Sequence, residues 1–316
     1  MNNLKKKFSV FLIICIVFLV SCNNKIEDTQ TNQIDNAKME VVKDVNLNIM
    51  TTNKLLYSMI KSIVNDKHSV QYMFSNRQSE LNFEFSSDSL NNIAKEDLFI
   101  YMGSSFDPWM NNFVENLNKS NVGVINVSRG GKLVSYNKIV KYKDIVLRDN
   151  PYYLLNLDNY KIALMNIKNA VQDKDPKNRE IYEKNFSETL RNIDNYQKDL
   201  KAVKDKLSDY TFVTMEDELS YFIKYNDFKV IDLSKEQATI DNNTKLNMGT
   251  KLKDNKNLIL LYNDSSLIKN YEDLIKKYNM KIVGIKVYNG EDKYEDVFKY
   301  NIENLEGFYE REVNKK

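Results

Sequence analysis

One uninterrupted stretch near the middle of the chain constrains the fold most. Residues 175–207 form a run of 33 residues without glycine, and their only proline, Pro176, falls in the first turn, where a helix tolerates it. Apolar side chains recur near helical spacing along this stretch. We therefore predict one long helix of roughly 50 Å, with two shorter helices as the alternative. A helix of that length divides the chain into two halves.

The first half alternates between apolar runs and amphipathic stretches. The runs that predict strands are 45–50, 68–74, 97–103 and 121–128. The stretches between them predict helices, one of them opened by Pro108 and Trp109. Such alternation is typical of a mostly parallel sheet with helices on its faces.

The second half repeats this rhythm. Strands are predicted at 211–215, 228–233, 257–263 and 281–288, and helices at 217–226, 264–278 and 294–310. The sequence thus predicts an α/β fold of two lobes, each a mostly parallel sheet flanked by helices, joined by one long linking helix. A ligand is expected in the crevice between the lobes, where strand ends face each other.

The N-terminus predicts export and lipid attachment. Three lysines, Lys5 to Lys7, precede the apolar run 8–20, which is short for a membrane span, and the run ends at Ser21-Cys22. A small residue before a cysteine at this place resembles a lipobox, so Cys22 is the predicted lipidation site on the extracytoplasmic face of a bacterial membrane. A signal anchor with a chance cysteine is the alternative.

These segments predict the domain organisation. The predicted ranges are a signal peptide at 1–21, a polar tether at 22–44, an N-terminal lobe at 45–174, the linking helix at 175–207 and a C-terminal lobe at 208–316.

Composition excludes several kinds of site. Cleavage before Cys22 leaves that cysteine as the only one, so disulfides and thiolate metal clusters are excluded, and the single histidine, His68, excludes a zinc site built from several imidazoles. His68 is expected at the surface or at a strand end. The chain carries 46 basic and 44 acidic residues, a balance that gives no reason to expect nucleic acid binding.

Five stretches carry a resemblance to a known family. In chain order they are DLFIYMGSSFDPWMNNFVENL, NPYYLLNLDN, DPKNREIYEKNFSETLRNID, VTMEDELSYFIKYNDFKV and YEDVFKYNIENL. Together they resemble the zinc and manganese substrate-binding lipoproteins of ABC importers, the cluster A-I or zinc-uptake group. The resemblance implies a lipid-anchored protein, without enzymatic activity, that delivers a divalent metal (Zn, Mn) to an ABC permease and its ATPase.

The positions that hold the metal in this family are substituted here. By the resemblance they fall on Leu81, Tyr152, Glu216, Asn263 and Lys286. Tyr152, Glu216 and Asn263 remain as weak oxygen donors, which suit magnesium, calcium or manganese better than zinc. Leu81 offers no donor and Lys286 is itself a cation, so the metal site is expected to be degenerate.

The charges of two of these residues suggest a replacement for the metal. Glu216 stands where the family has an imidazole, and Lys286 where it has a carboxylate. One hypothesis is that Lys286 reaches Glu216 across the pocket. The alternative is a solvent-exposed pair, which would contribute less than about 1 kcal/mol.

Aromatic residues near the predicted crevice have two interpretations. Tyr152, Tyr153, Phe83 and Phe85 could line a pocket for an organic ligand, although side chains of this kind more often fill space. Trp109, the only tryptophan, is expected in the core.

Two functions therefore stay open. The first is a transport receptor that binds a metal or another solute. The second is a surface adhesin or interaction lipoprotein that kept the fold without a transport role. An enzyme ranks last, since no acid pair or nucleophile–base spacing supports one.

Overall fold

A parallel four-stranded sheet begins the described part of the chain. The computed structural model describes residues 44–117, 120–235 and 242–315. The strand order in this N-lobe sheet is β2-β1-β3-β4, and every neighbouring pair is parallel. The strands are β1 (Asn48–Asn53), β2 (Ser69–Phe74), β3 (Leu98–Tyr101) and β4 (Gly123–Asn126).

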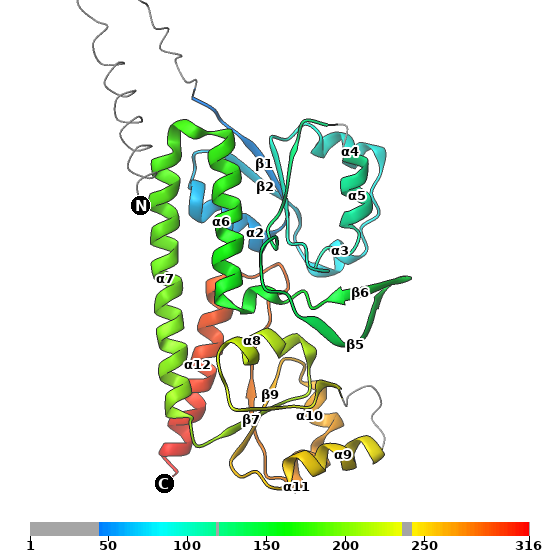
Figure 1. The fold of residues 1–316 in the computed structure, drawn as a ribbon, viewed down its shortest axis with the longest axis vertical. Helices are drawn as coiled ribbons and strands as arrows, with labels where there is room; N and C mark the ends of the chain where they lie inside the picture. Colours follow the sequence, from blue (N-terminus) through cyan, green and yellow to red (C-terminus); the bar gives the residue numbers. More distant parts are fainter. Residues whose placement is uncertain (1–43, 118–119, 236–241, 316) are drawn as a thin grey trace, which may run out of the picture. The chain divides into compact units, whose positions relative to one another are not determined.

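The helices of this lobe connect successive strands (Figure 1). Asn53 caps the first of them, because its side chain accepts a hydrogen bond from the main-chain N–H of Leu56. That helix buries an apolar stripe against the sheet. The helices are α2 (Lys54–Val64), α3 (Arg77–Leu81), α4 (Ser87–Ile93) and α5 (Met110–Leu117).

A second parallel sheet forms the C-lobe, in the order β10-β9-β7-β8. Its strands are β7 (Thr211–Thr214), β8 (Val230–Asp232), β9 (Leu258–Tyr262) and β10 (Lys281–Gly284). Its short helices are η3 (Asp217–Leu219), α8 (Ser220–Tyr225), α9 (Asn242–Leu252), α10 (Ser266–Asn270) and α11 (Glu272–Lys277). The predicted two-lobed α/β fold with mostly parallel sheets is confirmed.

Three long helices run beside the sheets. They are α6 (Leu157–Lys174), α7 (Arg179–Lys206) and α12 (Tyr294–Val313), and short turns η1 (Tyr153–Leu155) and η2 (Pro176–Asn178) precede α6 and α7. Helix α7 has 28 residues and packs against α2, α6 and α12. The long middle helix is therefore a single element, as predicted, and the two-helix alternative is wrong.

One hydrophobic core connects the lobes. The largest cluster of buried side chains includes Ile49 and Ile100 of the N-lobe sheet as well as Phe212 and Leu261 of the C-lobe sheet. Tyr160 on α6 stacks on Tyr294 of α12 with ring centroids 3.7 Å apart. The lobes therefore share this cluster, and each lobe has in addition a smaller cluster of its own, around Leu260 in the C-lobe and around Phe99 in the N-lobe.

An antiparallel ribbon, which the sequence analysis did not predict, projects from the body between the two sheets (Figure 1). It consists of β5 (Ser135–Tyr142) and β6 (Ile145–Asp149). We call it the β5–β6 ribbon. Its side chains alternate between half-buried and exposed along β5, which is the period of a strand with one face against the body.

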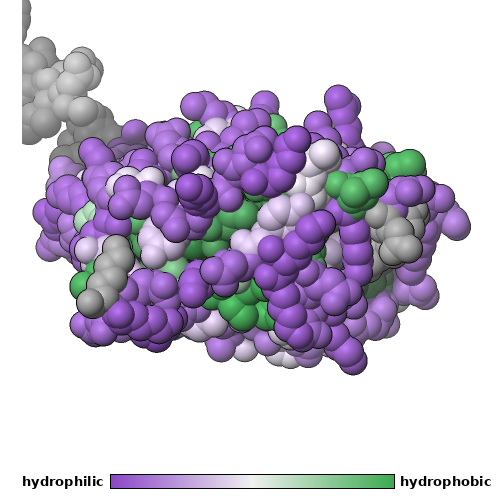
Figure 2. Space-filling model, turned by 90° about the horizontal axis from the view of Figure 1, so that it is seen from below, coloured by the Kyte–Doolittle hydropathy of each residue, from purple (hydrophilic) through white to green (hydrophobic). Residues whose placement is uncertain are grey.

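The surface seen from the C-lobe end is largely hydrophilic, with smaller hydrophobic areas between (Figure 2). Within the described ranges, no helix is both long and apolar enough to cross a bilayer. The predicted signal peptide and Cys22 lie outside the described residues.

Candidate functional site

A polar cavity lies where β7 and β9 end. Its volume is about 410 Å³. It brings together Tyr152, Glu216 and Asn263, three of the positions singled out from the sequence. The other lining residues are Lys138, Glu218, Asp264, Ser266, Leu267 and Asn270. The carboxyl ends of parallel strands are the usual place for ligands in α/β folds.

Glu216 is fixed at the inner wall of this cavity. It lies two residues after the end of β7 and is only 4% exposed. Its two carboxylate oxygens accept hydrogen bonds from the main-chain N–H groups of Asn263 (2.7 Å) and Asp264 (3.0 Å). Burial raises the pKa of Glu216 to about 7, although these two bonds favour the ionised form. The carboxyl group is thus held by the backbone after β9.

Asn263 and Tyr152 offer weak donors beside it. The Asn263 side-chain oxygen accepts the main-chain N–H of Val287 at 3.1 Å, so one of its lone pairs is already in use. The Tyr152 ring packs edge-on against Tyr288, with ring centroids 5.6 Å apart. Burial, and after it the charge of Glu218, raises the pKa of the Tyr152 phenol. Tyr152 is therefore neutral near pH 7 and a poor metal ligand.

The proposed ion pair between Glu216 and Lys286 is wrong. The Lys286 Nζ donates to Oδ1 of Asp292 at 2.9 Å. The chain leaves the sheet after β10, and Asn301 on α12 binds both the main-chain N–H and the carbonyl of Lys286. These two hydrogen bonds fix the main chain of Lys286, and its side chain extends toward Asp292 rather than toward the cavity.

Leu81 contributes only its backbone, because its carbonyl accepts the Tyr142 hydroxyl at 2.7 Å. The residue before it in the sequence, Glu80, belongs to a buried pair of acids. Glu80 is 1% exposed, accepts Nη1 of Arg77 at 2.7 Å and is hydrogen-bonded to the carboxyl of Asp107. Sequence reasoning missed this acid pair.

In this pair the fold favours the protonated form of Glu80. Burial, followed by the charge of Asp107, raises the pKa of Glu80 to about 9. Burial likewise raises the pKa of Asp107, and the Gly103 main-chain N–H binds one of its oxygens at 2.9 Å. The Arg77 guanidinium is the cation that faces this pair, since its Nη1 lies 2.7 Å from Glu80, and it also lies 3.8 Å from the centre of the Phe106 ring. The only sequence signal was the i,i+3 spacing of Arg77 and Glu80.

The available donors do not fit a zinc ion. Across residues 44–117, 120–235 and 242–315, no group of three or more His, Cys, Asp or Glu side chains is arranged to hold a metal. Zinc needs about four good donors. Leu81 and Lys286 supply none, and Glu216 already binds two main-chain N–H groups.

The aromatic residues divide between the two interpretations. Trp109 is buried and packs edge-on against Phe74, Phe83 and Phe113, which confirms its place in the core. Phe83 and Phe85 belong to the same cluster and Tyr153 is fully buried, so these three fill space. Tyr152 alone among the four lines the cavity.

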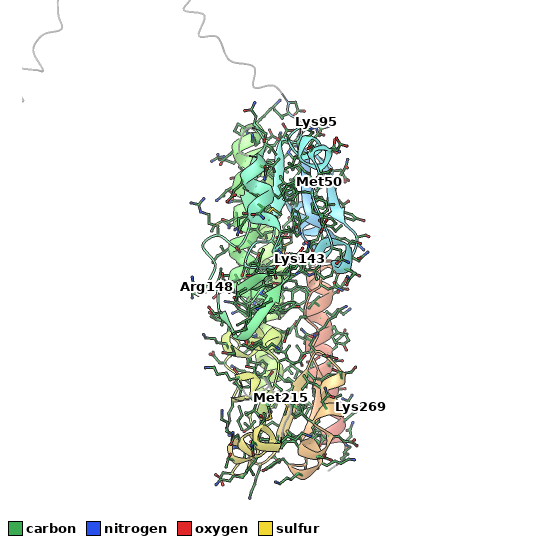
Figure 3. The ribbon with its side chains drawn as sticks, turned by 90° about the vertical axis from the view of Figure 1, so that its right-hand side faces the viewer. Met50, Lys95, Lys143, Arg148, Met215 and Lys269 are labelled. Atoms are coloured by element: carbon green, nitrogen blue, oxygen red, sulfur yellow. The ribbon has the colours of Figure 1, made fainter. Side chains whose placement is uncertain are left out.

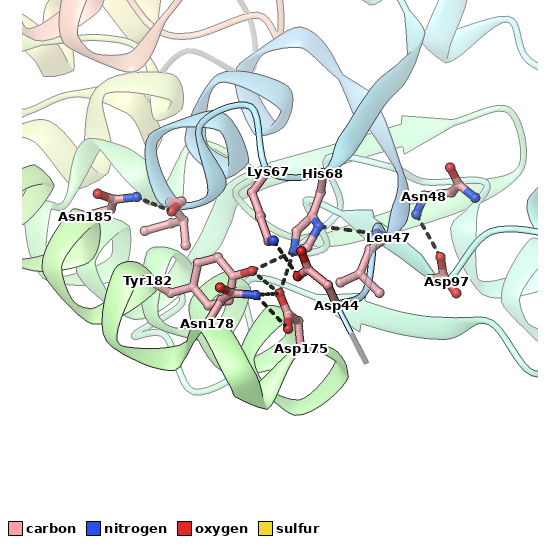
Figure 4. Close-up of polar contacts among 11 residues, drawn as sticks. Asp44, Leu47, Asn48, Lys67, His68, Asp97, Asp175, Asn178, Tyr182 and Asn185 are labelled. Carbon is pink, nitrogen blue, oxygen red and sulfur yellow. Dashed lines mark hydrogen bonds and ion pairs between the residues drawn. The ribbon is translucent and has the colours of Figure 1, made fainter. Parts of the chain in front are cut away.

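His68 lies just before β2, at the strand end that was one of its two expected positions. It is buried and not at the surface. Its Nδ1 accepts the main-chain N–H of Leu47 at 3.3 Å, which places the proton of the neutral ring on Nε2. Nε2 lies 2.7 Å from the Tyr182 hydroxyl, which in turn donates to Asp175 (Figure 4). Burial lowers the pKa of His68. This network joins the N-lobe sheet to the start of α7.

We expect Tyr182→Phe to lower the free energy of unfolding by about 1–3 kcal/mol, because it leaves buried polar atoms of His68 and Asp175 without their partner. Urea unfolding measures the change. The matched control is Tyr57→Phe, at a half-buried tyrosine, for which we expect a change within about 0.5 kcal/mol. Equal effects of the two substitutions would contradict a contribution of the network of His68, Tyr182 and Asp175 to stability.

The comparisons with known proteins decide the family. The family described as the zinc-uptake complex component A, periplasmic, matches residues 49–307. The chain belongs to this zinc-uptake family. The resemblance inferred from the sequence is therefore confirmed. The family is a substrate-binding component of ABC transporters and not a family of enzymes.

Curated relatives of this zinc-uptake family protein are metal transporter lipoproteins. A metal ABC transporter substrate-binding lipoprotein of Lactococcus lactis is 26% identical over 67% of the chain and 65% of its own length, just under two thirds. The manganese ABC transporter substrate-binding lipoprotein PsaA of Streptococcus mitis is 26% identical over 70% of the chain and 69% of its own length.

Solved structures show the same fold. The metal-dependent lipoprotein YcdH from Bacillus subtilis aligns with a TM-score of 0.64 at 19% identity, over 84% of the chain and 98% of its own. The Zn(II)-bound AdcA from Streptococcus pneumoniae aligns with a TM-score of 0.60 at 18% identity, over 84% of the chain and 57% of its own.

Proposed function

We propose that this protein is the lipid-anchored, extracytoplasmic solute-binding component of a metal-type ABC importer. Cys22 would carry the lipid, and an ABC permease with its ATPase would receive the solute. The observation that carries the proposal is the polar cavity at the ends of β7 and β9, which contains Tyr152, Glu216 and Asn263 in a chain of the zinc-uptake family.

The association with a permease is tested on the lipidated chain extracted from its own membrane. We expect it to co-purify with a permease and an ATPase of the importer type, and deletion of that permease to abolish uptake of the solute. A chain that binds no solute and associates with no permease would instead support the alternative, a surface interaction lipoprotein without a transport role.

The metal site itself is degenerate in this proposal. Its oxygen donors suit a hard cation, and the cation must displace the proton that burial favours on Glu216. Since the pKa of Glu216 is about 7, affinity for a cation rises as the pH increases through that value.

Isothermal titration of the mature chain with zinc, manganese and calcium provides the measurement. We expect micromolar or weaker binding of each ion, and weaker binding still in Glu216→Gln, which removes the one buried carboxylate of the cavity wall. Glu188→Gln, on the exposed side of α7, is the matched control and should leave the titration unchanged. Sub-micromolar zinc binding that survives Glu216→Gln would refute the degenerate site.

A further inference from the structure

The β5–β6 ribbon is held against the body in a defined orientation. The main-chain N–H and the side-chain amide of Asn137 donate to the buried carboxylate of Asp217 at 3.0 and 2.7 Å. Farther along β5, the Tyr142 hydroxyl donates to the carbonyl of Leu81 in the N-lobe. The ribbon therefore contacts both lobes, and its half-buried Lys138 reaches the cavity wall.

The opposite side of the ribbon, which we call its outer face, combines aliphatic and cationic side chains. The antiparallel register pairs Lys141 with Val146, so these two project from the same face. Ile139 and Arg148, two residues away on each strand, are exposed like them. Ile139 is 80% exposed and Val146 59% exposed, although the solvent side of a strand normally carries polar residues.

The charge of this segment is opposite to that of the remaining chain. Residues 132–149 contain five basic and two acidic residues, a net charge of +3. Residues 22–316 as a whole carry −1, so the chain outside this segment carries −4. The cations of the outer face are Lys141 and Arg148, because Lys138 lines the cavity and Lys143 pairs with Glu84. A basic face on an otherwise acidic chain is complementary to an anionic surface.

We propose that the outer face of the ribbon rests on the anionic phospholipid surface of the membrane to which the chain is anchored. This inference rests on the proposed function, because it is the lipid on Cys22 that would bring the body to that surface. Lysine and arginine bind anionic headgroups, while Ile139 and Val146 enter the interface. An acidic protein would satisfy the cations but not the two aliphatic side chains.

This contact would orient the solute cavity. Lys138 lies on the inner side of the same ribbon and lines the cavity, whereas Ile139 and Lys141 lie on the outer face. A ribbon that rests on the bilayer therefore keeps the cavity close to the membrane in which the permease lies.

Vesicle binding of the mature chain, with Cys22→Ser so that no lipid is attached, tests the proposal. Sedimentation measures how the chain partitions between solution and vesicles, once with phosphatidylcholine alone and once with mixed phosphatidylcholine–phosphatidylglycerol. We expect clear preference for the anionic vesicles, lost at high salt. The substitutions Lys141→Glu/Arg148→Glu are expected to lower partition into anionic vesicles at least about tenfold. Ile139→Ser/Val146→Ser should lower it by about the same factor.

Lys95→Glu/Lys269→Glu is the matched control, because it makes the same change of charge at exposed lysines far from the ribbon (Figure 3). Less than about a twofold change is expected for it. Equal binding by the ribbon and control variants, or no preference for anionic vesicles, would overturn the proposal.

Loss of permease co-purification in the ribbon variants, with vesicle binding unchanged, would overturn the proposal in favour of a protein partner. Each of these outcomes leaves the proposed solute-binding function standing, since the metal titrations and the permease deletion test it separately.

Discussion

Replacing Arg77 with methionine is expected to lower the free energy of unfolding by about 3–5 kcal/mol. The guanidinium is the cation that faces the buried Glu80–Asp107 pair, and its Nη1 lies 2.7 Å from Oε2 of Glu80. Methionine keeps much of the contact with Phe106 but leaves one uncompensated negative charge among buried atoms. Urea unfolding at pH 7 gives the change.

The matched control for this substitution is Arg191→Met. Arg191 is 73% exposed on α7 and lies 3.8 Å from Glu188 in an i,i+3 pair of the same type. We expect it to cost less than about 1 kcal/mol, because solvent screens the pair. Similar losses at the two arginines would show that Arg77 acts as an ordinary surface residue.

Glu80→Gln is expected to make the protein increasingly more stable than the native chain as the pH rises. The pKa of Glu80 is about 9 in the fold against an ordinary value of 4.5, so folding favours the protonated acid. The native chain therefore loses stability as the pH rises from about 4.5 to about 9, by up to about 1.4 kcal/mol for each pH unit. Glutamine keeps an acceptor for Arg77 and a donor for Asp107, but it does not titrate.

Unfolding curves at pH 5, 7 and 9 measure this difference. Glu84→Gln, at an exposed carboxylate paired with Lys143, is the control and should follow the native pH dependence. A constant difference between Glu80→Gln and the native chain across this range would mean that Glu80 is not protonated in the fold.

The fold was predictable because the central strands β3, β7 and β9 are buried on both faces. Runs such as residues 97–103 and 257–263 are almost wholly apolar, which is the pattern of a parallel sheet covered by helices. The long helix was predictable because residues 175–207 lack any glycine that would interrupt it. The strand predicted at 281–288 was too long. β10 ends at Gly284, and beyond it the side chain of Asn301 binds the main chain of Lys286.

The β5–β6 ribbon was harder to predict. Residues 135–142 alternate between exposed and half-buried, but three lysines interrupt the segment 135–149 and its longest apolar run is only residues 145–147. The ribbon is held by Asp217 and Leu81, which are distant in sequence and became apparent only from the fold.

The candidate site was predictable in position but not in detail. The resemblance placed Tyr152, Glu216 and Asn263 together, and they line one cavity. The partner of Lys286 depends on a contact with α12, and the pairing of Glu80 with Asp107 depends on how α3 meets the turn that follows β3. Neither contact leaves a pattern in the local sequence.

The shared core limits how a solute could leave. Tyr288 and Tyr294 of the C-terminal part donate hydrogen bonds to the carbonyls of Pro151 and Leu154 from within the packed interior. Swinging the sheets apart would break these bonds and expose the aromatic rings to water. A solute would therefore have to enter and leave through the side of the cavity where Asp264, Ser266 and Asn270 are exposed, with the lobes staying together.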